Sequence, residues 1–322
     1  MSTGSLVESG GSTAAEPPAA AGVPGQAGPG GAAAHEAHDP NGSGANGPVG
    51  PTGPGGLGGR GGTNGPSGAA GTGGGVKSAD RTVLILELLS EHSKPMSLAE
   101  LQRELGVPKS SLHNLLQTLV GRGWLETREG GSQYAIGLRA LRVGAAYLER
   151  DPLVAAAGPV LAELRSMLDE TVHLARLDGA DIVYLASRES THHLRSSSRI
   201  GRRLPAHSTA LGKVLLAARS PQAVREMLPA RLLALTPETI TDHDVLQAEL
   251  TEIRVQGYSL EQGQATPGLS CVAVAVSGRH PATDAISCSV PQIRLTDAHR
   301  DQIIAALTQA AEELGHRVRM LG

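Results

Sequence analysis

The stretch 96–125 most constrains how this chain can fold, because it predicts two short helices joined by a tight turn. Ser97 and Glu100 have the spacing of a capping box, in which each side chain accepts a hydrogen bond from the backbone N–H of the other residue. Gly106 can end the first helix with positive φ, and Pro108 suits the first turn of the second helix, where its missing N–H costs nothing. The stretch therefore predicts a helix-turn-helix.

The second helix of this pair is expected to bury one side and expose the other. Its leucines recur at helical spacing and face inward. Polar and basic side chains remain for the outer face, which is the layout of a helix that reads DNA. An αα-hairpin in an ordinary core shares this spacing and stays open as an alternative on this stretch alone. The outer face consists of Lys109, Ser110, Ser111, His113, Asn114 and Gln117.

The residues after the second helix favour DNA binding, because they predict a β-hairpin, or wing. Residues 124–126 read as a strand, 128–132 as a Gly-Gly turn and 133–136 as the returning strand. Arg128 stands at the tip of this wing, where its charge can reach phosphate.

Two further helices are expected beside this unit. The first is capped by Ser78 or Asp80 and runs to about Ser90, with Val83, Leu84, Leu86, Leu88 and Leu89 as its apolar set. The second spans 138–150 and places Leu138, Leu141, Val143, Ala146 and Tyr147 roughly on one face, with Arg139, Arg142 and Arg150 outside it.

The segment 151–322 predicts helices and strands joined by hairpin turns, as in an α+β domain with a largely antiparallel sheet. Ser208 is expected to cap a short helix, and Gly315 is expected to stop the last one. Met167 and Val245 are expected among the inward helix residues. The expected strands are 172–177, 182–186, 258–261, 271–276 and 285–290.

Several short blocks across 76–322 occur in the order of one known family. They include Leu-Gly-Val-Pro-Lys-Ser-Ser at 105–111, Leu-Pro-Ala-His-Ser-Thr-Ala-Leu-Gly-Lys at 204–213 and Gly-Leu-Ser-Cys-Val-Ala at 268–273. On these blocks the chain resembles the IclR-type bacterial transcription regulators. The resemblance implies a winged helix-turn-helix, a linker helix that pairs with its copy, and an α/β ligand-sensing domain, usually in a dimer or tetramer. It also adds Arg81, from the matching block 77–81, to the DNA-contacting residues.

The resemblance further implies an effector site in the C-terminal part. Ser287 and Ser289 stand two apart on a predicted strand, so both face one side of the sheet. Two hydroxyls and the free N–H groups of a helix N-terminus can bind a carboxylate or a polyol. The alternative is that both serines face solvent. The implied set is Leu204, Ala210, Leu211, Glu261, Leu269, Cys271, Ser287 and Ser289.

Two departures from the family pattern limit what can be carried over. Asn114 stands where many relatives have Arg; Asn favours adenine and Arg favours guanine, so the operator sequence cannot be copied from a relative. Gly263-Gln264 stands where the family often has an acidic residue, which weakens the transfer of effector chemistry.

The expected organisation has four parts. Residues 1–75 hold 25 of the 42 glycines and no apolar periodicity, so they are expected to be a disordered Gly/Ala/Pro-rich tail. The winged helix-turn-helix follows at 76–137, the linker helix at 138–150 and the effector-binding domain at 151–322.

Composition and motifs exclude several classes of protein. Two Cys rule out a disulfide framework or a four-Cys zinc site. The absence of a long apolar run and of a signal peptide favours a cytoplasmic protein without membrane contact. The segment 210–213 fails as a phosphate loop because His207 and Val214 occupy required Gly and Ser/Thr positions. Cys271 has no identifiable base. We therefore expect no catalytic residues, no metal and no cofactor.

These observations predict a DNA-binding transcriptional regulator, a repressor of a catabolic operon controlled by a small organic-acid effector. Its expected partners are a double-stranded DNA operator, the effector, and further copies of itself in a homodimer or a dimer of dimers. An activator of the same family, or a small-molecule enzyme with an accessory DNA-binding domain, remains as an alternative.

Overall fold

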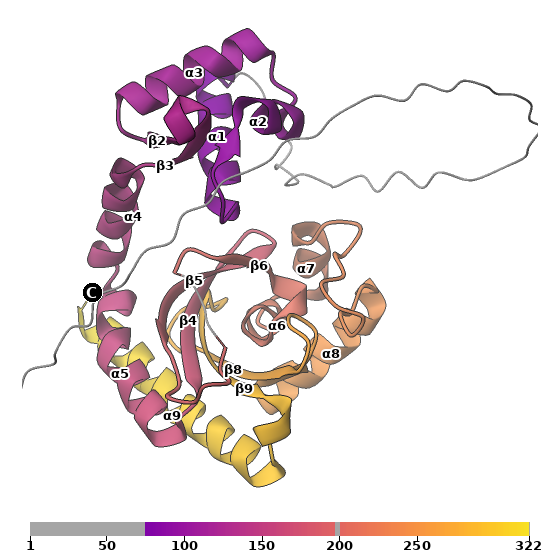
Figure 1. The fold of residues 1–322 in the computed structure, drawn as a ribbon. Helices are drawn as coiled ribbons and strands as arrows, with labels where there is room; N and C mark the ends of the chain where they lie inside the picture. Colours follow the sequence, from indigo (N-terminus) through magenta and orange to yellow (C-terminus); the bar gives the residue numbers. More distant parts are fainter. Residues whose placement is uncertain (1–74, 197–199, 322) are drawn as a thin grey trace, which may run out of the picture. The chain divides into compact units, whose positions relative to one another are not determined.

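A computed structural model of the chain describes residues 75–196 and 200–321. The expected tail therefore lies outside the described residues except for Gly75. The N-terminal elements, drawn in purple in Figure 1, are α1 (Lys77–Glu91), β1 (Met96–Ser97), α2 (Leu98–Leu105), α3 (Lys109–Gly121), β2 (Leu125–Arg128), η1 (Glu129–Gly131) and β3 (Gln133–Ile136). The strands form an antiparallel sheet in the order β1-β3-β2. The predicted winged helix-turn-helix is confirmed, with β1 as an addition that the sequence did not indicate.

The turn chemistry of the helix-turn-helix is largely as predicted. The N–H of Ser97 donates to Glu100 Oε2 at 2.7 Å and the N–H of Glu100 donates to Ser97 Oγ at 3.3 Å, which completes the capping box. Gly106 ends α2 with φ 63°. Pro108 stands one residue before α3 as its N-cap, not inside the first turn.

The start of α1 differs from the prediction. The N-cap is Val76, without a side-chain hydrogen bond, so neither Ser78 nor Asp80 caps the helix; both lie inside it. Val83 is 52% exposed, whereas Ile85, absent from the predicted apolar set, is fully buried. The predicted set was therefore wrong at these two positions.

The C-terminal elements build a six-stranded sheet in the order β6-β5-β4-β9-β8-β7, with every neighbouring pair antiparallel. This confirms the predicted α+β class. The elements are α4 (Leu138–Arg150), α5 (Pro152–Leu168), β4 (Thr171–Asp178), β5 (Asp181–Arg188), β6 (Arg203–Pro205), η2 (Ala206–Ser208), α6 (Ala210–Ala217), α7 (Pro221–Met227), α8 (His243–Gln256), β7 (Ser259–Gln262), β8 (Leu269–Ala275), β9 (Asp284–Pro291), η3 (Gln292–Arg294) and α9 (Asp297–Leu321).

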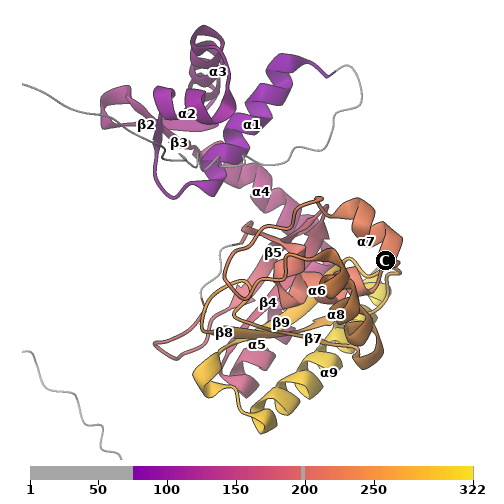
Figure 2. The same cartoon turned by 90° about the vertical axis from the view of Figure 1, so that its right-hand side faces the viewer.

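At several positions of the central strands, the two faces of this sheet carry side chains of different size. Large side chains, such as Leu174 and Ile286, pack with α5 and α9. Small ones, such as Ala175, Ala273 and Ala285, pack with α6, α7 and α8. Figures 1 and 2 show α5 and α9 over one face and α6 against the other. Strand alternation thus leaves space on the α6 face.

Several local predictions in this domain were wrong. The cap of α6 is Thr209, whose Oγ1 accepts from the N–H of Gly212; Ser208 Oγ instead donates to the Pro205 carbonyl. Met167 and Val245 are exposed rather than buried. Met167 of α5 and Val245 of α8 each lie on the solvent side of their helix, next to the apolar residues that face the core.

Helix α4 was expected to gather its apolar residues roughly on one face, and most of them cover a broad arc, with Ala146 among the arginines outside it. At 3.6 residues per turn, Leu138 and Leu141 lie nearly opposite Val143 and Tyr147. All four are more than half exposed, and no residue of α4 is buried. The two pairs belong to one broad apolar side, because Ala140, Gly144 and Leu148 lie between them.

Arg176 on β4 connects three neighbouring elements. Its Nη1 donates to Tyr147 Oη of α4 at 2.8 Å, and its Nε donates to Asp284 Oδ1 of β9 at 2.6 Å. It also pairs with Asp151, whose carboxylate caps α5 by accepting from the N–H of Leu153 at 3.0 Å. These bonds fasten the end of α4 to the sheet.

Within the described residues, no helix is long and apolar enough to span a bilayer.

Gly315 lies inside α9 rather than ending it, because the helix continues to Leu321. A Cβ at this position would stand 2.4 Å from the Ser277 carbonyl oxygen. The glycine therefore permits α9 to approach the backbone after β8, which is a packing role and not a stop signal.

Replacing Gly315 with Ala should lower the free energy of unfolding by about 1–3 kcal/mol, because the new methyl group would force the Ser277 backbone to shift. The matched control is Gly144→Ala in α4, where a Cβ meets nothing within 4 Å. That change should leave stability unchanged or raise it by up to about 1 kcal/mol through helix propensity. Urea unfolding measures both, and equal effects would contradict the close contact.

Candidate functional site

The candidate DNA-reading surface is the outer side of α3. Leu112 and Leu116 are fully buried and hold the helix in one orientation. Five of the six residues predicted for the outer face are exposed: Lys109, Ser110, His113, Asn114 and Gln117.

The sixth, Ser111, is half-buried and accepts a hydrogen bond from Arg81 Nη1 at 3.2 Å. This bond ties α1 to α3. Arg81 therefore lies beside α3, and the Ser111 hydroxyl is less available to a DNA base than the prediction assumed.

Arg128 ends β2 at the wing and its side chain is largely exposed. Its Nη2 pairs with Glu126 Oε2 at 2.8 Å. An exposed pair of this kind contributes at most about 1 kcal/mol, so phosphate can compete for the guanidinium.

All eight residues of the implied effector set line a single cavity on the α6 face of the sheet. The structure thus brings together side chains from β6, α6, β7, β8 and β9. Six further lining residues were missed by the sequence analysis: Tyr184, Ser196, Arg202, Thr209, Ala265 and Thr266.

The two serines of β9 point into this cavity rather than to solvent. Ser287 is 1% exposed and Ser289 is 3% exposed, so the alternative that both face solvent is wrong. Ser289 Oγ lies 3.1 Å from Cys271 Sγ of the neighbouring strand β8. Period-two alternation was sufficient to place these hydroxyls together.

The N-terminus of α6 forms another wall. The first N–H groups of a helix have no intrahelical partner, and Ala210 and Leu211 at this position line the cavity. Gly212 fixes the approach of the preceding turn η2, because a Cβ there would stand 2.1 Å from the Ala206 carbonyl oxygen. Donors and a partial positive charge are thereby held at the cavity.

The cavity is small in this conformation. Its free volume is about 30 Å³, comparable with the space of a single water molecule. An organic acid would therefore enter only with movement of the surrounding side chains.

Burial disfavours the charged forms of the acidic groups that line the cavity. Glu261 is almost fully buried, and this burial raises its pKa, although its Oε2 accepts from the N–H of Gln264 at 2.8 Å. Burial also raises the pKa of the Cys271 thiol well above its usual range and raises the pKa of Tyr184. The cavity therefore favours neutral hydrogen-bonding groups over fixed negative charge.

Lys213 of α6 is a buried cation that the sequence did not single out. Its Nζ, fully enclosed, donates to Glu249 Oε2 at 2.7 Å and to Gln264 Oε1 at 2.6 Å. Burial lowers the pKa of Lys213, and Glu249 opposes this shift. Gln264, one of the departures from the family pattern, thus anchors the β7–β8 connection to α6. The sequence feature that could have predicted this buried cation is a single lysine within an otherwise apolar helix, α6.

His173 of β4 lies beneath the cavity, opposite Ser287 in the register. Its Nδ1 lies 3.0 Å from Ser187 Oγ, and its ring meets the Tyr184 ring edge-on at 5.1 Å. Burial lowers the pKa of His173 to about 4. A bulge places both partners here, because Leu174 pairs with Ala186 while Ala175 pairs with Tyr184.

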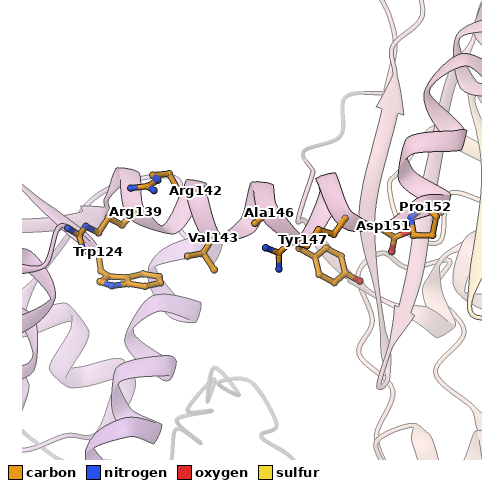
Figure 3. Close-up of a pocket in the computed structure, with 9 residues that line it drawn as sticks. Trp124, Arg139, Arg142, Val143, Ala146, Tyr147, Asp151 and Pro152 are labelled. Carbon is orange, nitrogen blue, oxygen red and sulfur yellow. The ribbon is translucent and has the colours of Figure 1, made fainter.

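A second, open groove of about 720 Å³ runs along α4. Figure 3 shows Val143, Ala146 and Tyr147 following one side of the helix. The arginines predicted to lie outside the apolar set instead share this groove. Its lining is Trp124, Arg139, Arg142, Val143, Ala146, Tyr147, Arg150, Asp151 and Pro152.

Two family descriptions match this chain. The IclR helix-turn-helix domain matches residues 78–129, and the C-terminal domain of the bacterial transcriptional regulator IclR matches residues 145–316. The chain belongs to the IclR family. It is a DNA-binding transcriptional regulator, as the resemblance implied.

Individual IclR-family proteins agree with this assignment over most of their length. The chain is 33% identical over 243 residues to the HTH-type transcriptional regulator BhcR of Paracoccus denitrificans, covering 75% of this chain and 87% of BhcR. It is 33% identical over 245 residues to the transcriptional repressor IclR of Escherichia coli, covering 75% and 89%. The IclR regulator structure from Alicyclobacillus acidocaldarius aligns with TM-score 0.68 and 25% identity, over 76% of this chain and 99% of that one. These relatives are regulators and not enzymes, which confirms that prediction.

Replacing Glu261 with Gln should change the pH dependence of stability. Burial raises the pKa of Glu261 above its usual 4.5 in the folded state, so wild-type stability falls as pH rises from that value through the folded pKa. The Gln variant lacks this loss and should gain stability relative to wild type as the pH rises from 4 to 8. Urea unfolding at both pH values measures the difference; Glu252→Gln, at an exposed position of α8, is the control. A pH-independent difference would show that ionisation of Glu261 is not penalised.

Proposed function

We propose that this IclR-family regulator represses a catabolic operon and leaves its operator when a small organic acid binds the cavity. The observation that carries the proposal is the enclosed, donor-lined cavity in the same chain as an exposed reading helix. Repression is supported by relatives that are named as repressors, among them the acetate operon repressor of Salmonella typhimurium, 32% identical over 75% of this chain. Since its target is chromosomal DNA, the protein would act in the cytoplasm.

In this proposal, the exposed residues of α3 read bases in the major groove of the double-stranded operator. Asn114 supplies both a donor and an acceptor and suits adenine. Ser111 acts mainly with Arg81 to fix the helix, and Arg128 binds phosphate at the wing. Phosphate contacts set the orientation, whereas base contacts set the sequence.

Operators can be isolated by selecting bound fragments from the genome of the source organism, and gel-shift titrations then compare variants. Asn114→Ala should weaken binding to the selected site by about 1–3 kcal/mol and change binding to random DNA little. Gln309→Ala, an exposed polar-to-Ala change on α9, should change neither. Equal losses on both DNAs would reject base reading by Asn114.

The effector is proposed to carry both an acid group and a donor. The hydroxyls of Ser287 and Ser289 and the N–H groups at the start of α6 suit a carboxylate. Glu261 can accept from a hydroxyl or an ammonium. A hydroxy acid, a sugar acid or an amino acid has both features; Leu204 and Leu269 would cover its carbon skeleton.

The double variant Ser287→Ala/Ser289→Ala should weaken acid binding by about 1–3 kcal/mol through lost hydrogen bonds to a charged group. Operator affinity without acid should stay unchanged, because both serines lie in the C-terminal sheet. Calorimetry over lactate, glycerate, gluconate and alanine provides the measurement. The matched control is Ser166→Ala on the exposed side of α5. Unchanged binding in the double variant would reject this site.

A homodimer, or a dimer of dimers, is proposed to form through α4. The helix has no buried residue, and Leu138 and Leu141 are 66% and 65% exposed. Burial of such side chains against a second copy would contribute about 25 cal/mol for each Å² removed from water. Two subunits would also present two reading helices to a two-fold operator.

A further inference from the structure

Arg202 is the one strongly cationic residue of the cavity. Among the described residues that line it, Arg202 is the only Lys or Arg and Glu261 the only Asp or Glu. Arg202 is also exposed, so it stands where the cavity meets solvent. An anion that approaches the cavity would meet this charge first.

The guanidinium of Arg202 makes no contact of the kind that its neighbour makes within the described residues. Its neighbour Arg203 donates to Asp178 Oδ2 at 2.8 Å and to Asp181 Oδ2 at 3.0 Å. Across the part of the chain that the structure describes, the Arg202 side chain has neither a hydrogen bond nor an ion pair. A guanidinium offers five donors, and its planar fork matches a carboxylate.

The charge of Arg202 acts on the groups around the cavity. It adds to burial in lowering the pKa of His173, and it opposes the burial that raises the pKa of Tyr184. Both groups lie beside Ser287 or in the cavity wall. The positive field therefore extends into the cavity as well as outward.

The strand order places the polar groups in sequence across the sheet. Arg202 directly precedes β6 at one edge, Glu261 lies on β7 at the other edge, and Ser287 and Ser289 lie on β9 between them. A ligand across this face would meet a cation, then hydroxyls, then a buried carboxyl group with a raised pKa.

We propose that Arg202 binds the carboxylate of the effector and selects anionic over neutral ligands. The serine hydroxyls then bind the middle of the molecule, and Glu261 accepts from its hydroxyl or ammonium group. This inference rests on the proposed function, because it assumes a small acid as effector. It differs in assigning the acid group to Arg202, and not to the two serines and the N-terminus of α6, so that the serines bind an uncharged part of the ligand.

The test is a charge series at one position, Arg202→Lys, Arg202→Gln and Arg202→Glu, in the full-length protein. Calorimetry with lactate and with glycerate gives the affinities, and melting temperatures confirm folding. Lys should weaken binding least, Gln by about tenfold through loss of a charged hydrogen bond, and Glu most. Arg231→Gln, at an exposed arginine outside the cavity lining, should leave the affinities unchanged.

The outcomes separate this inference from the proposed function. A graded loss in the order Lys, Gln, Glu supports a charge contact. Wild-type affinity in Arg202→Gln overturns the role of Arg202 and leaves the acid effector intact. Equal losses in all three variants overturn it too, because shape and not charge would then matter. If the wild-type protein binds neither acid, both the inference and the proposed effector class are rejected.

Discussion

The cavity depends on the alternation of side chains along the central strands. On β9, Ser287 and Ser289 face α6, whereas Ile286, Cys288 and Val290 face α5 and α9. One strand thus completes a densely packed core on one side and leaves volume beside small side chains on the other. A shift of one residue in its pairing would move both hydroxyls into the apolar core, so the register that stabilises the domain also creates the site.

The charged groups around this sheet fall into two classes: those whose charge is paired with another part of the fold, and those whose charge is free to meet a ligand. Lys213 is enclosed by Glu249 and Gln264, and Arg176 is bound to Asp284 and Tyr147. Removing one partner of such a buried pair leaves an uncompensated charge, which makes these residues poor candidates for ligand binding. The cavity itself combines a carboxyl group and a thiol, both with raised pKa values, with the cation of Arg202 at its edge, which is the basis for proposing an anionic ligand that also carries a hydrogen-bond donor.

Local and periodic features were predictable from the sequence, whereas features set by tertiary contact were not. The capping box of Ser97 and the shared face of Ser287 and Ser289 follow from spacing alone. The role of Gly315 depends on a carbonyl 38 positions earlier in the chain, at Ser277, and no local pattern reports it. Arg202 and its neighbour Arg203 look alike in the sequence; only the fold assigns carboxylate partners to the second.

The bulge in β5 has a consequence for how this protein family can vary. Tyr184 and Ser187 are three residues apart, so they would face opposite sides of a regular strand. Leu185 is the extra residue of the bulge, and it brings both side chains to the same side, where both contact His173. The aromatic wall of the cavity is therefore set by the length of β5 as much as by its composition. Deleting a single residue there would turn the Tyr184 ring to the α5 side and leave the other side chains of the cavity unchanged. Two cavities lined by the same residue types could therefore differ in shape because one strand differs in length.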